Sequence, residues 1–207
     1  MSKIGFIGCG NMACAMISQM LEKDAVHPED VLASARTEET LERVQKRLGI
    51  NVTPDNRTVV RESDIIFLSV KPQDYEDVIM EIRYEVTPEQ IIVTIAPGKT
   101  LAWVGNIFGR KVKVVRTMPN TAALVGEGVT GACHNNFVSE EDFEQVESLI
   151  RCFGECVTVK ESMMDVVGSV GGSAPALVYM FIEAMADAAV ADGMKRDMAY
   201  KFAAQAV

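Results

Sequence analysis

The sequence contains little of what a metal centre, a nucleic-acid surface or a disulfide-stabilised secreted protein requires. Only 2 histidines occur, and 29 acidic residues outnumber 20 basic ones; the net charge of −9 argues against nucleic acid as a partner. The 5 cysteines are an odd number without a Cys-x-x-Cys pair or zinc-finger spacing. No secretory leader precedes the first predicted strand. We therefore expect a cytoplasmic protein with reduced, mostly buried thiols and no bound metal.

The most informative segment that is present lies at residues 4–13. An apolar strand, Ile4–Ile7, runs directly into a glycine-rich turn and then into a helical pattern. In a dinucleotide-binding motif Gly8 makes the tight turn, Gly10 lets the backbone approach a pyrophosphate, and Ala13 takes the third glycine position. The phosphates then lie at a helix N-terminus, where unpaired N–H groups favour negative charge. Because glycines also mark ordinary turns, a plain strand-to-helix connection is the alternative. The predicted cradle consists of Gly8, Cys9, Gly10, Asn11 and Met12.

The end of the second predicted strand indicates which dinucleotide is bound. NAD sites usually place an acidic residue about 20 residues after the glycines, where it binds the ribose 2′-hydroxyl. This chain has Ser34, Ala35, Arg36 and Thr37 there instead. An arginine binds phosphate oxygens through paired, charge-assisted hydrogen bonds, so we predict that Ser34 and Arg36 hold the 2′-phosphate of NADP. The alternative is that Arg36 is a solvated surface residue.

Strand and helix patterns alternate along the first 160 residues. This alternation predicts an α/β fold with a Rossmann-type doubly wound, mostly parallel sheet. Two further strands, at 128–133 and 155–159, are expected at the far edge of the sheet, with a helix at 140–150 between them. The other predicted strands are 4–7, 31–35, 51–52, 64–70, 90–95 and 112–116, and the other predicted helices are 12–24, 38–48, 55–62, 73–83 and 101–107.

Two of these strand ends are candidates for the nicotinamide end of the cofactor. Ligands of open parallel sheets bind outside the carboxyl ends of the strands. The sequence places residues 69–72, which include a lysine, at one of these ends, and residues 96–98, which include a glycine, at the other. Position rather than composition supports this role; the alternative is a surface lysine followed by a helix-starting proline. The candidates are Ser69, Val70, Lys71, Pro72, Ala96 and Gly98.

The segment 173–192 is helical in pattern and nearly all apolar, with Glu183 and Asp187 as the only charges before Asp192 at its end. A helix that is apolar all round is buried in protein or in a membrane. We exclude the membrane because the uncharged stretch is shorter than the roughly 20 residues that a span needs. Only one further helical segment, 194–207, remains to cover it, and the chain stops in mid-pattern. We therefore expect a truncated chain whose helical region forms an interface.

Three motifs together resemble the Δ1-pyrroline-5-carboxylate reductase family. They are the glycine loop at 6–13, the segment Ser69-Val70-Lys71-Pro72-Gln73, and, most specifically, Arg116-Thr117-Met118-Pro119-Asn120-Thr121. The segment from Pro175 to Asp187 is similar to the start of the family's helical dimerisation domain. The resemblance implies a dinucleotide-binding domain at 1–160 and a dimerisation domain at 161–207. Ala122 and the residues at 171–174 depart from the family pattern.

The resemblance also implies site residues. It gives Asn56 a place at the adenosine edge of the cofactor and Glu161 a contact with the nicotinamide ribose, although the sequence alone makes Glu161 an ordinary exposed acid. Met118, Asn120 and Thr121 are expected near the substrate. No catalytic residue is identified, because the family's candidate proton donor lies in a glycine-rich serine and threonine loop beyond Val207.

The function implied by the resemblance is reduction of 1-pyrroline-5-carboxylate to L-proline with NAD(P)H. NADPH is the preferred cofactor on the evidence of Arg36, and NAD remains possible. No catalytic base is required if the imine is already protonated, so the absence of a His–Asp or Ser–His pair does not count against an enzyme. The alternatives are another Rossmann imine or hydroxyacid reductase and a non-catalytic NADP-binding protein. We expect self-association through the helical region and neither a nucleic-acid nor a membrane partner.

Overall fold

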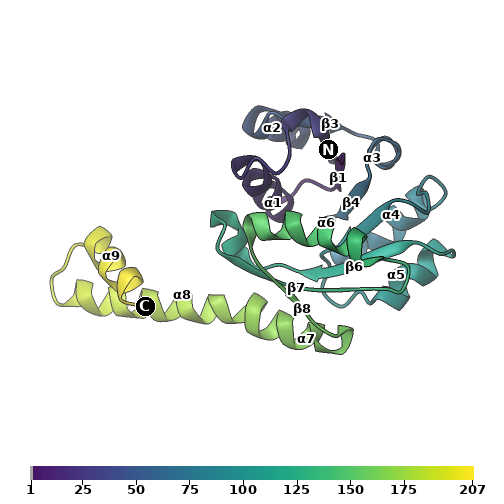
Figure 1. Cartoon of the computed structure of the whole chain (residues 1–207). Helices are drawn as coiled ribbons and strands as arrows, with labels where there is room; N and C mark the ends of the chain where they lie inside the picture. Colours follow the sequence, from purple (N-terminus) through teal and green to yellow (C-terminus); the bar gives the residue numbers. More distant parts are fainter. Residues whose placement is uncertain (1) are drawn as a thin grey trace.

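The computed structural model describes residues 2–207, which form a sheet-centred body with a helical arm extending from it (Figure 1). The sheet has 8 strands in the order β3-β2-β1-β4-β5-β6-β7-β8. The strands from β3 to β6 are all parallel, β7 is antiparallel to β6, and β8 is parallel to β7. The strands are β1 (Ile4–Ile7), β2 (Val31–Ser34), β3 (Asn51–Thr53), β4 (Ile65–Leu68), β5 (Ile91–Thr94), β6 (Lys113–Met118), β7 (Gly128–His134) and β8 (Gly154–Thr158).

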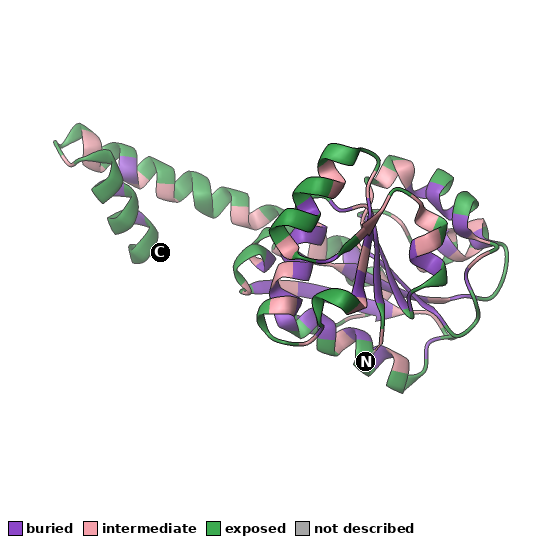
Figure 2. Ribbon diagram, turned by 90° about the horizontal axis from the view of Figure 1, so that it is seen from above, coloured by how far each residue is buried: buried purple, intermediate pink, exposed green. Residues whose placement is uncertain are grey.

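Helices cover both faces of the sheet, and this is why the central strands are apolar on both sides. Every residue of β1, β4 and β5 is buried (Figure 2). One core cluster joins the sheet to α1, α2 and α6, and a second joins the opposite face to α3, α4 and α5. These helices are α1 (Asn11–Glu22), α2 (Glu38–Leu48), α3 (Asn56–Arg61), α4 (Tyr75–Ile82), α5 (Leu101–Phe108) and α6 (Glu140–Ile150).

The predicted α/β Rossmann-type fold is confirmed, and two helices have the predicted bounds because side chains define their ends. Thr37 caps α2 by accepting the Thr40 N–H, and Gly49 ends it in the left-handed conformation. Ser139 and Asp142 form a reciprocal capping box at the start of α6. The strand predicted at 64–70 is shorter, and α4 starts later than predicted, because a 3₁₀ turn at Pro72–Asp74 separates them.

The helical arm contains the apolar helix predicted at 173–192, which we expect to be covered by an interface rather than by this chain. It contains α7 (Met164–Val167), a π-helical turn at Gly168–Ser173, α8 (Ala174–Ala191) and α9 (Arg196–Ala206). Of residues 174–191, all within the described chain, only Ala186 is buried, and it packs against α9. The helical stretch Glu161–Ala191 has 31 residues and contains an 18-residue window with a mean hydropathy of 1.4, so by length and composition alone it could cross a membrane; a single helix of this kind is weak evidence for a membrane span.

Tyr75 joins the two strand ends from which the predicted nicotinamide loops leave. Its side chain is fully buried at the start of α4. The hydroxyl donates a hydrogen bond to the carbonyl of Leu68 and accepts one from the N–H of Ile95 at 3.2 Å. Burial raises the pKa of Tyr75, so the hydroxyl keeps the proton that it donates. This bridge fixes the spacing between the ends of β4 and β5.

We predict that Tyr75→Phe lowers the free energy of unfolding by about 1–3 kcal/mol, because it leaves a buried N–H and a buried carbonyl without a partner. Urea denaturation measures this loss. Tyr84→Phe is the matched control, since Tyr84 is 77% exposed and its hydroxyl contacts only the neighbouring Arg83. Equal, small effects of the two substitutions would show that the bridge does not stabilise the fold.

Candidate functional site

The glycine turn between β1 and α1 has the geometry that the dinucleotide prediction requires. Gly8 has φ +88°, in the left-handed region that favours glycine. A Cβ added there would lie 2.7 Å from Cγ1 of Val70 and 3.1 Å from the carbonyl oxygen of Ser69. The Gly8 N–H donates to the carbonyl of Ser34 at 3.2 Å. Gly8 therefore brings the ends of β1, β2 and β4 together in a way that no larger residue permits.

Gly10 faces open space at the N-terminus of α1. No heavy atom lies within 4 Å of a Cβ built on it. Among residues 2–207, no side chain caps this end of α1, and the first turn contains no acidic residue. The first N–H groups of α1 are therefore free to bind an anion. Asn11 is exposed in that turn, whereas Ala13 is buried and allows α1 to pack on the sheet.

A cleft of about 400 Å³ opens beside this turn. On one side it is bounded by Gly8, Cys9 and Gly10, and on the other by the loop that contains Ser69, Val70 and Lys71. Residues from the end of β2 and the start of α2 complete it. These further lining residues are Ala35, Arg36, Thr37, Thr40, Arg43, Gln73 and Asp74.

Arg36 lies in this cleft and forms an ion pair with Asp74 at 2.9 Å, while its side chain remains 74% exposed. The guanidinium is therefore oriented but still accessible to a ligand. Arg43, which the sequence analysis did not single out, lies in the same cleft. The helical repeat of α2 carries the signal that could have found it, because Thr40 and Arg43 lie three positions apart on one face of that helix, which starts just after Arg36.

Ser34 and Asn56 are together, but behind the lining of the cleft. Ser34 is only 1% exposed, and its hydroxyl donates to Oδ1 of Asn56 at 2.7 Å. The Nδ2 group of Asn56 donates to Glu81 at 2.8 Å. The hydroxyl of Ser34 is thus engaged inside the fold and supports the Gly8 turn. This geometry favours Arg36 and Arg43, rather than Ser34, as phosphate ligands.

The strand ends predicted to hold the nicotinamide half separate into two groups. Ser69, Val70 and Lys71 line the first cleft, and the buried Oγ of Ser69 has no hydrogen-bond partner among the described residues. Pro72 starts the 3₁₀ turn before α4, and Ala96 is buried. Gly98, with φ +72° and open space around it, lines a second cleft of about 410 Å³ beyond the end of β5.

A buried arginine defines this second cleft. Arg116, at the carboxyl end of β6, has a side chain that is 4% exposed and donates to Oε1 of Glu161 at 3.1 Å. The same oxygen accepts the N–H of Leu101 at 2.7 Å and so caps α5. Asp165 lies 3.8 Å from the guanidinium and is 92% exposed. Glu161 is therefore not an ordinary exposed acid: it is the main partner of a buried charge.

Two of the three residues expected near the substrate, Met118 and Asn120, join the sheet to the helical arm. Asn120 donates to the carbonyl of Gly171 and accepts the N–H of Val129, both at 3.1 Å. Its amide is therefore occupied within the fold. The methyl end of Met118 contacts Gly168. The third residue, Thr121, begins a 3₁₀ turn after β6.

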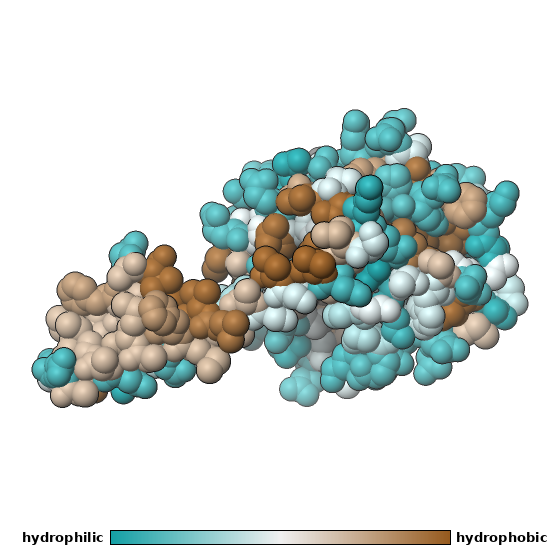
Figure 3. All heavy atoms as spheres, turned by 90° about the horizontal axis from the view of Figure 1, so that it is seen from below, coloured by the Kyte–Doolittle hydropathy of each residue, from teal (hydrophilic) through white to brown (hydrophobic). Residues whose placement is uncertain are grey.

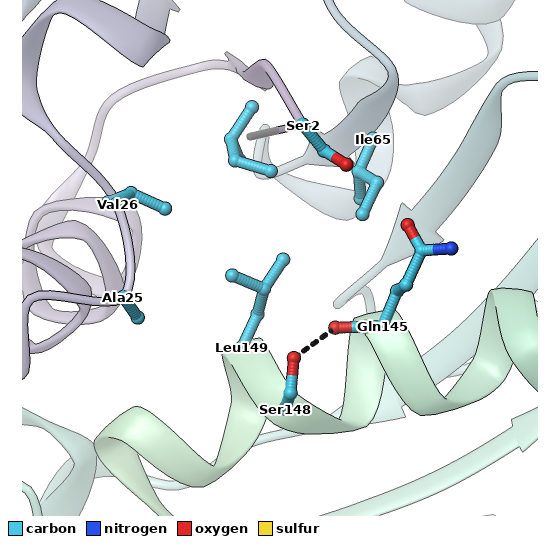
Figure 4. Close-up of a pocket in the computed structure, with 8 residues that line it drawn as sticks. Ser2, Ala25, Val26, Ile65, Gln145, Ser148 and Leu149 are labelled. Carbon is cyan, nitrogen blue, oxygen red and sulfur yellow. Dashed lines mark hydrogen bonds between the residues drawn. The ribbon is translucent and has the colours of Figure 1, made fainter.

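A further, smaller pocket does not belong to this region. It measures about 150 Å³ and lies near the first residues of β1 and β4, at the amino ends of the strands (Figure 4). The hydroxyl of Ser148 beside it donates to the carbonyl of Gln145 in its own helix. Since ligands of such sheets bind at the carboxyl ends, the two clefts described above are the candidate site.

Known proteins match both parts of the chain. Residues 3–98 match the family model for NADP oxidoreductase, coenzyme F420-dependent, and residues 161–207 match the model for pyrroline-5-carboxylate reductase dimerisation. Pyrroline-5-carboxylate reductase from Escherichia coli strain K12 is 42% identical over 205 residues, which cover 99% of this chain and 76% of that protein. The enzyme of the same name from Methanosarcina acetivorans is 40% identical with the same coverage. The chain belongs to the pyrroline-5-carboxylate reductase family.

Solved structures of the family agree with the fold. A pyrroline-5-carboxylate reductase from Coxiella burnetii superposes with a TM-score of 0.91 at 28% identity, over 99% of this chain and 76% of that one. The Plasmodium falciparum pyrroline carboxylate reductase, solved with NADP bound, also gives a TM-score of 0.91 at 28% identity, over 99% and 75%. The resemblance stated from three sequence motifs is confirmed.

We predict that Glu161→Ala lowers the free energy of unfolding by about 2 kcal/mol without any cofactor, because it leaves the buried Arg116 guanidinium without its main partner. Asp165→Ala is the matched control, since Asp165 is exposed, and it should cost less than about 0.5 kcal/mol. Chemical denaturation of both variants measures the difference. A Glu161 variant as stable as the Asp165 variant would contradict this structural role.

Proposed function

We propose that the chain is an NADPH-dependent reductase that converts 1-pyrroline-5-carboxylate to L-proline in the cytoplasm. The observation that carries this proposal is the single cleft in which the uncapped N-terminus of α1, Gly10, Arg36 and Arg43 are assembled. That arrangement fits a dinucleotide with one additional phosphate. The family's relatives, named for this reaction, supply the substrate.

The residues around the first cleft have separate tasks in holding the cofactor. The N–H groups after Gly10 bind the pyrophosphate, and the guanidinium groups of Arg36 and Arg43 bind the 2′-phosphate. Thr37 and Thr40 face the same cleft. The chain's net charge is −9, so this binding depends on these local donors rather than on the overall field.

The residues near β4, β5 and β6 position the reacting end. Ser69, Val70 and Lys71 bound the first cleft, while Gly98 and Glu161 bound the second. When bound, NADPH supplies the hydride that adds to the carbon of the protonated imine. The task of the protein is to hold that carbon against the nicotinamide and to bind the substrate carboxylate. We assign no catalytic acid among residues 2–207.

We predict that the protein oxidises NADPH only when pyrroline-5-carboxylate is present, and that Arg36→Ala weakens NADPH binding about tenfold or more while leaving NADH binding nearly unchanged. The reason is that only NADPH carries the 2′-phosphate. Initial rates at 340 nm, measured with each cofactor over a range of concentrations, give both Michaelis constants. Arg110→Ala, an exposed arginine in the turn after α5, is the matched control.

Two outcomes point to the alternative functions. Reduction of a different imine or a 2-oxo acid, but not of pyrroline-5-carboxylate, would favour another Rossmann reductase. Tight NADPH binding without turnover of any such substrate would favour a cofactor-binding protein. If Arg36→Ala lowers the affinity for NADPH and for NADH equally, the proposed role of Arg36 is contradicted, while the proposed reaction is not.

We also propose that the chain has two domains, 1–160 and 161–207, and that the second forms a homo-oligomer. Hydrophobic side chains gather along the arm and on the adjoining face of the body (Figure 3). On α8 the exposed ones include Leu177, Met180 and Phe181. An apolar groove of about 340 Å³, lined by residues such as Val157 and Val170, lies at the base of the arm. A second copy covering this surface accounts for an apolar helix without a membrane.

We predict that the protein sediments as a dimer or larger species at micromolar concentrations. Phe181→Glu and Leu177→Glu, which place a charge at i and i+4 on α8, should shift it towards monomer, because burying an unpaired carboxylate is costly. Met80→Glu, on α4 and 47% exposed, is the control and should leave the sedimentation coefficient unchanged. A monomer at all concentrations would overturn the interface proposal.

A further inference from the structure

Two buried thiols lie beside the phosphate-binding turn and have no task in the proposed reaction. Cys9 is part of the turn, and Cys14 follows in α1. Their Sγ atoms are 3.7 Å apart, and Sγ of Cys14 lies 3.8 Å from the carbonyl oxygen of Cys9. Both residues are at most 5% exposed. Cys9 is one of the residues that line the cofactor cleft.

The surroundings of the pair favour one thiolate. Either sulfur can donate in the contact between them, and the Cys14 thiol donates a long hydrogen bond to the carbonyl of Cys9 at 3.8 Å. The contact with Cys9 lowers the pKa of Cys14 below its ordinary value, and the positive charges of Arg47 and Arg43 on α2 act in the same direction. Burial acts against this shift, and the contact with Cys14 together with burial raises the pKa of Cys9. Cys14 is thus the nucleophile of the pair, since the thiolate is the reactive form.

We propose that Cys9 and Cys14 form a reversible disulfide that closes the cofactor cleft to NADPH under oxidation by a hydroperoxide. The Cys14 thiolate attacks one peroxide oxygen, the O–O bond breaks, and Cys14 becomes a sulfenic acid while hydroxide, or alkoxide, leaves. The Cys9 sulfur then attacks the Cys14 sulfur, forming the S–S bond and releasing water with the Cys9 proton. Two thiols are oxidised and one peroxide is reduced. A dithiol reverses the change by exchange.

The disulfide acts on the part of the turn that binds the pyrophosphate. A disulfide bond is about 2.05 Å long, so the two sulfurs must approach by about 1.7 Å. Gly8 cannot follow, because it packs against Ser69 and Val70. The Cys14 N–H is bonded to the carbonyl of Gly10 at 2.9 Å, which ties this part of the turn to α1. The part of the approach that side-chain rotation does not supply falls on the backbone from Cys9 to Asn11, whose N–H groups then no longer converge on a phosphate.

Cofactor and oxidant are expected to oppose each other. Bound NADPH would cover the Cys9 side of the cleft, and the disulfide would weaken NADPH binding. NADPH binding and disulfide formation therefore disfavour each other to the same extent. This part rests on the proposed function, because it takes NADPH as the ligand of the cleft. The formation of the disulfide itself does not depend on that assignment.

The experiment begins with the unmodified protein, treated with hydrogen peroxide and then freed of it. Trypsin releases residues 4–23 as one peptide, because no Lys or Arg lies between Lys3 and Lys23, and this peptide contains Cys9 and Cys14 but no other cysteine. We expect it to become lighter by two hydrogen atoms. NADPH fluorescence titration should show an affinity about tenfold or more lower, restored by dithiothreitol. Saturating NADPH present during oxidation should slow the mass change.

Cys14→Ser and Cys14→Ala test the mechanism, and Cys152→Ser is the matched control, because Cys152 is a buried cysteine outside the cleft. The Cys14 variants should bind NADPH before and after peroxide with equal affinity, while the control should respond like the unmodified protein. If no disulfide forms in peptide 4–23, or if it forms without weakening NADPH, the proposal is overturned. If the reduced protein does not bind NADPH but the peptide still oxidises, the proposed function fails and the disulfide stands.

Discussion

The close packing of Gly8 against the backbone of Ser69 is the constraint on which the rest of the site depends. From β1 the chain adds β2 and β3 on one side, and from β4 it adds β5 and β6 on the other, so the strand order reverses between β1 and β4. Ligands of parallel sheets bind at such a switch point. The left-handed Gly8 turn brings the three strand ends together there. Without a side chain at this position, α1 can start directly above the opening, and its free N–H groups face the cleft in which we propose that the pyrophosphate binds.

The parts of the fold that depend on neighbouring residues could be predicted from the sequence. Thr37 and Ser139 lie immediately before their helices, so the bounds of α2 and α6 follow from local hydrogen bonds. The phosphate cradle is local in the same sense, because one strand, one turn and one helix contain all of it. Arg36 could be found because it lies just after the end of a predicted strand. Arg43 could be found only by following the helical pattern of α2 further along the chain.

Residues whose roles depend on distant partners could not be placed in this way. Glu161 is 45 positions from Arg116 and 60 from Leu101, yet one of its oxygens serves both. The hydroxyl of Ser34, which we predict to hold the 2′-phosphate, donates to Asn56, 22 positions later. The composition of α8 predicts an interface but does not say which atoms cover it, and of residues 174–191 only Ala186 is buried in this chain. In each case the missing information is a tertiary contact, not a propensity.

The junction of the body and the arm connects the assembly of the protein to its site. Asn120, just after β6, holds the π-helical turn at Gly171, while Arg116, on β6 itself, holds Glu161 at the start of the same helical stretch. The direction of α8 is therefore set by groups at the carboxyl edge of the sheet. Each large apolar side chain buried on α8 contributes about 1.5–3 kcal/mol, and a two-fold interface counts every such residue twice. In the proposed oligomer, a second copy that covers α8 therefore also restrains Glu161 and the cleft beside Gly98, because both lie at the base of the same helical stretch.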